Sequence, residues 1–84
     1  MKRILLAEDE PITRRGLKKM IEEVIGGYQV AGEAADGQEA LLLLDRLRPD
    51  VLLTDIRMPQ MDGLALIRRA RERRGEMPII VISG

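Results

Sequence analysis

Short runs of apolar residues alternate along this chain with longer stretches in which apolar residues recur at helical spacing. The continuous runs at residues 4–7, 51–54 and 79–82 are rich in large aliphatic side chains, which is typical of strands buried on both faces. A weaker run at residues 28–34, interrupted by Gly32, predicts a further strand.

Between these runs, apolar positions repeat at i, i+3, i+4 and i+7, which predicts amphipathic helices. The residues expected on the core-facing stripes of three helices are Leu17, Met20, Ile21, Val24 and Ile25, then Ala40, Leu41, Leu44 and Leu47, then Leu64, Ile67 and Ala70. Helix starts and stops are marked by Pro11, Gly26, Gly27, Pro49 and Gly75. The order strand–helix–strand–helix–strand–helix–strand predicts a parallel α/β sheet with right-handed crossovers and helices on both faces.

The composition restricts the chemistry that this single domain of 84 residues can perform. Fourteen basic side chains balance 14 acidic ones, which disfavours a general nucleic-acid binder. The absence of Cys and His excludes a disulfide scaffold, thiol catalysis and histidine ligands. The apolar run after residues 1–3 is too short for a signal peptide or a membrane span. We therefore expect a cytoplasmic protein that contacts neither a membrane nor nucleic acid directly.

Acidic residues directly follow two of the predicted strands. Glu8 and Asp9 come after the first strand, Asp55 comes after the third, and Ser83 follows the fourth. Because the carboxyl ends of parallel strands lie along one edge of the sheet, these side chains are expected to meet if the first and third strands are neighbours. Two such carboxylates about 4 Å apart repel each other by roughly 4 kcal/mol at an effective dielectric of about 20, which favours a bound hard cation such as Mg²⁺. The competing interpretation is that the acids merely occupy polar turns.

Three segments of the chain resemble the receiver domain of two-component response regulators. They are Ala7-Glu8-Asp9-Glu10, Leu53-Thr54-Asp55-Ile56-Arg57-Met58-Pro59-Gln60-Met61-Asp62-Gly63 and Met77-Pro78-Ile79-Ile80-Val81-Ile82-Ser83-Gly84. The middle segment, an Asp followed by x-x-Met-Pro-x-Met-Asp-Gly, is highly specific. The resemblance implies a flavodoxin-like (CheY-like) fold, which is a doubly wound parallel sheet with strand order 2-1-3-4-5.

The resemblance also implies a role for each site residue. Asp55 would accept a phosphoryl group from a phosphohistidine of a sensor histidine kinase, and the Ser83 hydroxyl would turn toward that group. Mg²⁺ would be bound by the side chains of Asp9 and Asp55, by the backbone carbonyl of Arg57 and, through water, by Glu8. Such a domain is a switch that assists only its own phosphorylation and dephosphorylation, so an enzyme is not expected. The residues of these motifs resemble those of regulators with an AraC-type DNA-binding output, which predicts control of transcription by an output domain outside this chain.

The chain departs from the family at its C-terminal end. We expect residues 1–84 to form a partial receiver domain that lacks the fourth helix, the fifth strand and the fifth helix, together with a family Lys that pairs with the phosphoryl group. Impaired phosphorylation is expected for this reason. The fourth strand would be an apolar, uncharged edge, which predicts a homodimer or larger self-association through that strand. The alternative is that the missing part was cut away and such contacts have no biological meaning.

Two other functional classes stay open. A metal-dependent phosphatase or hydrolase on a related α/β fold is disfavoured, because Asp55 is not followed two residues later by a second Asp. An inert structural or self-associating fragment that retains the acidic site is the other alternative.

Pro59 and Gly63 are interpreted as shaping the loop after Asp55. One side of the first helix is expected to be either solvated or in contact with the kinase, and it carries Arg14, Arg15, Lys18 and Lys19.

Overall fold

The computed structural model describes residues 1–82. Its strands are β1 (Lys2–Ala7), β2 (Tyr28–Ala34), β3 (Val51–Asp55) and β4 (Ile79–Ile82). Its helices are α1 (Pro11–Lys19), the π-helical segment η1 (Met20–Ile25), α2 (Gly37–Leu47) and α3 (Gly63–Arg73). No helix among these residues is long and apolar enough to cross a bilayer.

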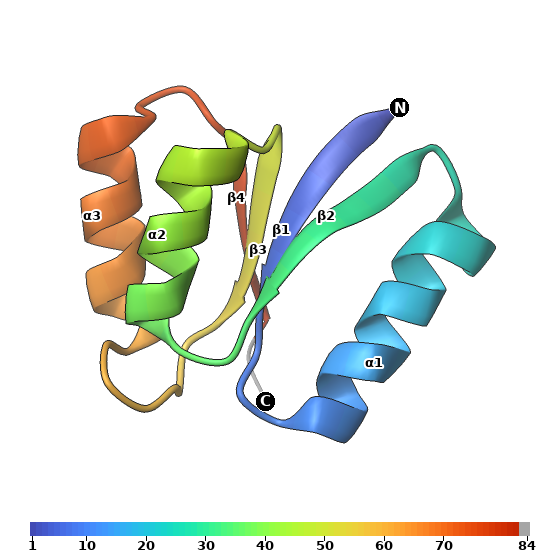
Figure 1. The fold of residues 1–84 in the computed structure, drawn as a ribbon, viewed down its shortest axis with the longest axis horizontal. Helices are drawn as coiled ribbons and strands as arrows, with labels where there is room; N and C mark the ends of the chain where they lie inside the picture. The colour runs from blue at the N-terminus through green and yellow to red at the C-terminus, as the bar shows by residue number, and fades with distance from the viewer. Residues whose placement is uncertain (83–84) are drawn as a thin grey trace.

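The four strands form one parallel sheet in the order β2-β1-β3-β4. This order and the α/β class confirm the predicted architecture for the four strands present. Figure 1 shows α2 and α3 on one face of the sheet and α1 on the other. The two ladders that matter for the site join β1 to β3, where Ala7 is paired with Thr54, and β1 to β2, where Ala7 is paired with Ala34.

The sheet separates two hydrophobic cores, because successive side chains of a strand point to opposite faces. Beneath α2 and α3, the larger core contains Leu5, Ala7, Ala34, Ala40, Leu41, Leu44, Leu52, Leu66, Ala70 and Met77. Beneath α1 and η1, the smaller core contains Ile4, Leu6, Ile21, Val30 and Val51. The continuous apolar runs of β1 and β3 therefore supply both cores, as expected of strands buried on both faces.

The predicted stripe of the first helix is confirmed in part. Ile21 is buried and Leu17 packs against the smaller core. Met20 and Ile25 line the apolar side of the sheet but are 48% and 61% exposed, and Val24 is 77% exposed. The α-helix gives way to the π-helical η1 at Met20, and wider π turns change the angular spacing of side chains from that assumed by an α-helical stripe. The predicted stop is correct, since Gly26 and Gly27 have φ values of 76° and 80°, which suit glycine.

The prediction for the third helix is wrong at one core position. Leu66 and Ala70 are buried, but Leu64 is 59% exposed. Asp62 caps α3 by accepting a hydrogen bond from the Ala65 amide at 2.9 Å. This cap starts the helix at Gly63. Leu66 and Ala70 lie four residues apart on the face that packs into the larger core, and Leu64 lies off that face.

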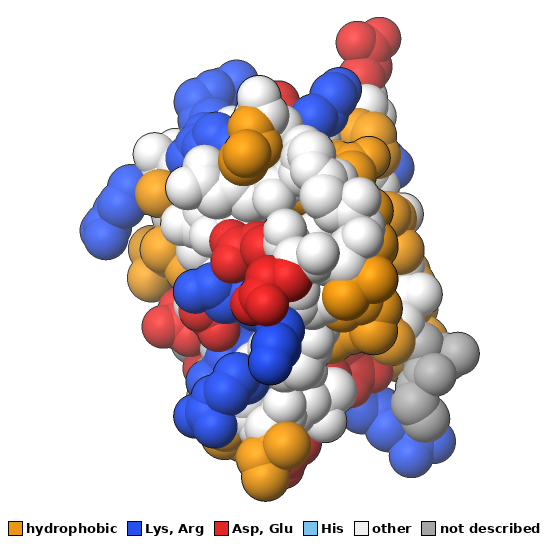
Figure 2. All heavy atoms as spheres, turned by 90° about the vertical axis from the view of Figure 1, so that its right-hand side faces the viewer, with side chains coloured by type: hydrophobic (Ala, Val, Ile, Leu, Met, Phe, Trp, Pro, Cys, Tyr) orange, Lys and Arg blue, Asp and Glu red, His pale blue; other side chains and the backbone are white. Residues whose placement is uncertain are grey.

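The α1 side of the sheet is incompletely covered. An apolar groove of about 520 Å³ lies between the first helical segment and β4, with Leu17, Ile21, Leu53, Ile80 and Ile82 among its lining residues. Figure 2 shows apolar side chains gathered along one side of this face, beside a band of mixed charge. The helical segments α1 and η1 therefore leave part of this face of the sheet open.

Candidate metal centre

Three carboxylates converge where β1 and β3 end. One oxygen from each of Glu8, Asp9 and Asp55 lies within 4.8 Å of the other two. The strand order explains this proximity, because β1 and β3 are hydrogen-bonded neighbours that run in the same direction. The predicted meeting of these three side chains is therefore confirmed.

Glu8 is the buried member of the cluster, with an exposed fraction of 4%. Its backbone amide continues the sheet by donating to the Ala34 carbonyl at 2.9 Å, and its Oε2 accepts a hydrogen bond from the Glu10 amide at 3.0 Å. Burial raises the pKa of the Glu8 carboxyl above its ordinary value, the Glu10 amide opposes this, and the neighbouring Asp9 and Asp55 raise it further. A nearby cation would offset the cost of ionising this group.

Asp55 is half-buried at the end of β3 and is held by the backbone that follows it. Its Oδ1 accepts hydrogen bonds from the amides of Ile56 at 2.7 Å and Arg57 at 3.4 Å. Among the hydrogen bonds of residues 1–82, none involves the second oxygen, Oδ2. The local backbone therefore fixes the carboxyl plane, and within residues 1–82 it leaves the second oxygen without a hydrogen-bond partner.

Gly63 shapes the loop after Asp55, as the sequence predicted. Its amide donates to the Ile56 carbonyl at 2.6 Å and closes the loop. A Cβ atom at this position would collide with the backbone of Asp55 and would lie 2.6 Å from the Ile56 Cα. Sequence reasoning missed a second contact of this kind, at Gly37, where a Cβ atom would lie 2.7 Å from the Met61 Cβ.

Two predicted site residues are not placed in the cluster by the structure. Arg57 is exposed in the loop after β3, and its carbonyl as a metal ligand stays a prediction. Ser83 lies outside the described residues, so its hydroxyl also stays a prediction.

Arg14 is a site neighbour whose position sequence reasoning did not identify. The sequence predicts a solvated or kinase-facing side chain here, but the Arg14 side chain is 22% exposed and turns back toward the site. Its Nη1 donates to the Glu8 carbonyl at 2.7 Å, and its Nε lies 3.4 Å from the Glu33 carboxylate. No local signal in the sequence distinguishes Arg14 from the exposed Arg15 next to it.

The donor set of this centre fits magnesium. All three side chains offer carboxylate oxygens, and Mg²⁺ prefers hard oxygen ligands and retains several waters. Asp9 is exposed and Asp55 is half-exposed, so water can complete the coordination shell. Three mutually repelling acids at a partly open edge of the sheet match this ion better than a softer metal.

The chain belongs to the response regulator receiver domain family, whose model matches residues 4–84. It is 46% identical over 80 residues to a protein-glutamate methylesterase/protein-glutamine glutaminase of Hahella chejuensis, an alignment that covers 95% of this chain and 22% of that protein. It is 39% identical over 83 residues to the transcriptional regulatory protein YdfI of Bacillus subtilis, covering 99% of this chain and 38% of that protein.

Solved structures are similar over the same range. The receiver domain of AraT, a response regulator from Geobacillus stearothermophilus, has a TM-score of 0.90 and 44% identity, covering 99% of this chain and 64% of that one. A CheX–CheY–BeF3–Mg²⁺ complex from Borrelia burgdorferi has a TM-score of 0.90 and 27% identity, covering 98% of this chain and 61% of that one. The predicted family and the CheY-like fold are confirmed. The sequence spans less than two-fifths of either curated relative.

Proposed function

We propose that Asp55 accepts a phosphoryl group from a phosphohistidine of a sensor histidine kinase, with Mg²⁺ bound at the adjacent carboxylates. The observation that carries this proposal is the convergence of Glu8, Asp9 and Asp55, with oxygens within 4.8 Å of one another. Receiver domains bind Mg²⁺ at an acidic site of this kind, and the Borrelia CheX–CheY complex contains both Mg²⁺ and BeF3.

The chemistry asks for positioning more than for covalent assistance. A free Asp55 oxygen attacks phosphorus, the phosphorus–nitrogen bond of phosphohistidine breaks, and the released imidazole nitrogen takes up a proton. The amides of Ile56 and Arg57 hold Oδ1, and Oδ2, which has no hydrogen-bond partner within residues 1–82, would make this attack. The product is an aspartyl phosphate, which water can hydrolyse to regenerate the carboxylate.

Asp9, Asp55 and the Arg57 backbone carbonyl would hold the metal directly, and Glu8 would hold it through water. Bound Mg²⁺ offsets negative charge on the transferring oxygens. The chain's own contribution is to fix these donors. Hydrogen bonds from the Glu10 and Ile56 amides orient the Glu8 and Asp55 carboxyls before any ligand arrives. The Ser83 hydroxyl is proposed to turn toward the phosphoryl group.

The test is the intact mass of the chain after incubation with acetyl phosphate or phosphoramidate. In keeping with the impaired phosphorylation expected from the sequence, we expect slow addition of one phosphoryl group in Mg²⁺, none in EDTA and none in Asp55→Asn. Asp45→Asn is the matched control, because Asp45 is exposed on α2, where it forms a surface ion pair with Arg73. Modification that persists in Asp55→Asn would contradict the assignment. Mg²⁺ binding without modification of any variant would favour the inert alternative.

The wider role is that of a cytoplasmic switch that reports phosphorylation to an output domain. Relatives of this chain are named both as methylesterases and as transcriptional regulators, and we propose transcription as the output, without direct nucleic-acid contact by this chain. Any catalytic activity of a longer protein would belong to its other domains. The description of residues 1–84 as a partial receiver domain stays a prediction.

A second candidate function is self-association through β4. Among the described residues β4 pairs only with β3, and its Ile80 and Val81 are 54% and 42% exposed. An uncharged apolar edge of this kind is a template for strand pairing. A two-fold axis perpendicular to the sheet would pair β4 with β4 of a second copy in antiparallel fashion.

Sedimentation velocity at increasing protein concentration tests this association. Val81→Lys should shift a dimer to monomer, because a charge on the edge opposes strand pairing. Leu42→Lys is the control, since Leu42 is 65% exposed on α2 and does not belong to the sheet edge. A wild-type chain that stays monomeric at high concentration would contradict the proposal.

A further inference from the structure

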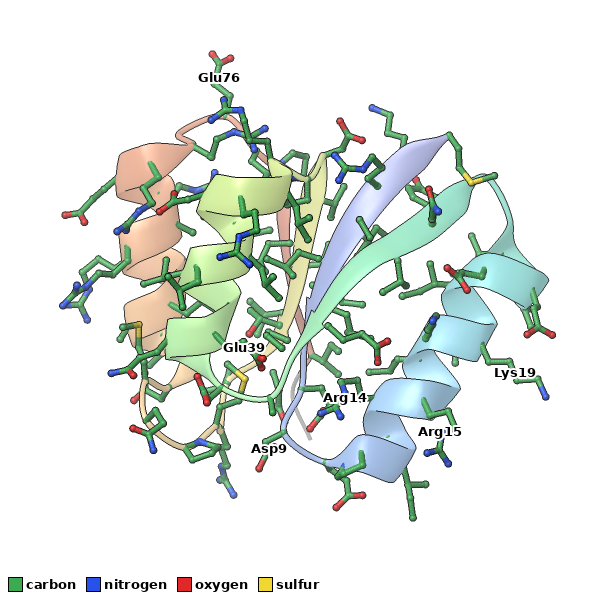
Figure 3. The ribbon with its side chains drawn as sticks, viewed as in Figure 1. Asp9, Arg14, Arg15, Lys19, Glu39 and Glu76 are labelled. Atoms are coloured by element: carbon green, nitrogen blue, oxygen red, sulfur yellow. The ribbon has the colours of Figure 1, made fainter. Side chains whose placement is uncertain are left out.

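Arg14 connects three separate parts of the structure beside the acidic cluster. It lies on α1, it donates from Nη1 to the Glu8 carbonyl at the end of β1 at 2.7 Å, and its Nε contacts the Glu33 carboxylate on β2 at 3.4 Å. Figure 3 shows Arg14 between α1 and the ends of the strands, whereas Lys19 projects away from the sheet. Arg14 is the more enclosed partner of the ion pair, at 22% exposure against 37% for Glu33.

The Arg14–Glu8 hydrogen bond closes the segment that carries Asp9. This segment is held at one end because the Glu8 amide donates to Ala34 and the Glu8 carboxylate accepts from the Glu10 amide. At its other end the Arg14 amide donates to the Glu10 carbonyl at 2.9 Å, and the Glu10 side chain caps α1. The Arg14 guanidinium fastens the two ends to each other, so Asp9 lies on a short loop with both ends fixed.

A cation this near a metal site has two opposite effects. Its positive charge repels Mg²⁺, whereas its hydrogen bond holds the ligand-bearing loop in place. Glu33 reduces the first effect in part, because its carboxylate lies 3.4 Å from the Arg14 Nε and is shared with Lys18 at 3.6 Å. The arrangement therefore retains the geometric contribution of the guanidinium while a neighbouring carboxylate partly offsets its charge.

We propose that Arg14 is a positioning residue for the magnesium site, acting through the Glu8 carbonyl and held in turn by Glu33. The proposal rests on the proposed function, because it concerns the same acidic centre. It requires the forked guanidinium, since a single ammonium group is a point donor that does not reproduce the two directed contacts. Outer-shell hydrogen bonds that orient metal ligands typically change metal affinity by 10- to 100-fold.

The test is the Mg²⁺ dissociation constant, measured by titrating MgCl₂ into the ¹⁵N-labelled chain and following the amide signals. We expect Arg14→Ala and Arg14→Lys each to weaken Mg²⁺ binding by about 10-fold. Arg15→Ala and Arg15→Lys are the matched controls, because Arg15 is the exposed neighbour on the same helix. Both controls should stay within about twofold of wild type. Urea unfolding of each variant shows whether it is folded under the titration conditions.

The Arg14 variants also separate geometry from charge. If Arg14 acts only through its charge, Arg14→Ala tightens Mg²⁺ binding and Arg14→Lys leaves it unchanged, and either result in folded protein overturns the inference. Glu33→Gln provides a second readout, since it should release Arg14 and weaken binding while the cluster itself stays intact. A wild-type chain that binds no Mg²⁺ would instead refute the proposed function. Normal wild-type binding with unaffected Arg14 variants would refute this inference alone.

Discussion

Removing one carboxylate from the acidic cluster should stabilise the metal-free protein and abolish its stabilisation by Mg²⁺. The variant is Asp9→Asn, which has nearly the same shape and no charge. Asp9 takes part in two of the three repulsive pairs formed with Glu8 and Asp55. With oxygens no more than 4.8 Å apart, each pair costs about 1 kcal/mol in the dielectric of water. Because Asp9 is exposed and salt screens it, we expect a gain of about 1–2 kcal/mol in the free energy of unfolding.

Magnesium should reverse this order of stabilities. A ligand that binds only the folded state stabilises it by about 2.7 kcal/mol at 100 times its dissociation constant. The wild type therefore gains more from Mg²⁺ than it loses to repulsion, whereas Asp9→Asn gains little. Urea unfolding followed by circular dichroism, in EDTA and at several Mg²⁺ concentrations, should show the two stability curves crossing.

Glu76→Gln is the control for the loss of one negative charge. Glu76 lies at the opposite end of the sheet from Asp9 (Figure 3) and is exposed, so its replacement should change stability by less than about 0.5 kcal/mol in either medium. If Asp9→Asn is less stable than wild type in EDTA, the three carboxylates do not destabilise the metal-free protein by mutual repulsion, which contradicts the prediction. Equal stabilisation of both proteins by Mg²⁺ would show that the ion binds elsewhere.

Three further perturbations test the fold around the site. Gly63→Ala should destabilise the chain by about 1–3 kcal/mol and weaken Mg²⁺ binding, because its methyl group meets the backbone of Asp55. Gly16→Ala is its control and should instead stabilise the chain by about 1 kcal/mol, since nothing lies within 4 Å of the added atom. Urea unfolding should therefore show a lower stability for Gly63→Ala and a higher stability for Gly16→Ala. Asp36→Ala should cost about 1 kcal/mol in the same assay, because it removes the acceptor for the Glu39 amide at 2.8 Å, and an unchanged midpoint would contradict that cap. Burial raises the pKa of Glu8 in the folded protein. In EDTA, the stabilising contribution of the protonated Glu8 carboxyl to the free energy of unfolding is therefore fully present below the ordinary glutamate pKa of about 4.3. This contribution is lost as the pH rises through the higher folded-state pKa. Glu8→Gln should therefore lose less stability than wild type between about pH 4 and neutrality, and parallel pH profiles would contradict this assignment.

The local pattern of the sequence predicts most of the secondary structure. Continuous apolar runs and helical spacing are properties of neighbouring residues, so they identify the four strands and the order in which helices connect them. The same information placed Asp9 and Asp55 at strand ends. It could not exclude the view that acids merely occupy polar turns, because proximity in space depends on which strands are neighbours.

The sequence-based expectations fail where a residue's surroundings depend on the packing or the backbone geometry of an element. Leu64 and Leu66 are both apolar residues of one helix, and the packing of that helix on the sheet decides which of them enters the core. Val24 follows the predicted stripe but is exposed, because η1 does not keep α-helical spacing. Both outcomes depend on packing or backbone geometry that the apolar pattern does not encode.

The sequence by itself determined the element order, the family motifs and the identity of the three acids. Only the tertiary structure decided that Glu8 is buried while Asp9 is exposed, and that Arg14 turns inward while Arg15 does not. The physical reason is that burial and charge pairing are set by segments far apart in the chain. Glu33 must reach Arg14 from β2, and β3 must lie beside β1, before the acids and their supporting cation form one site.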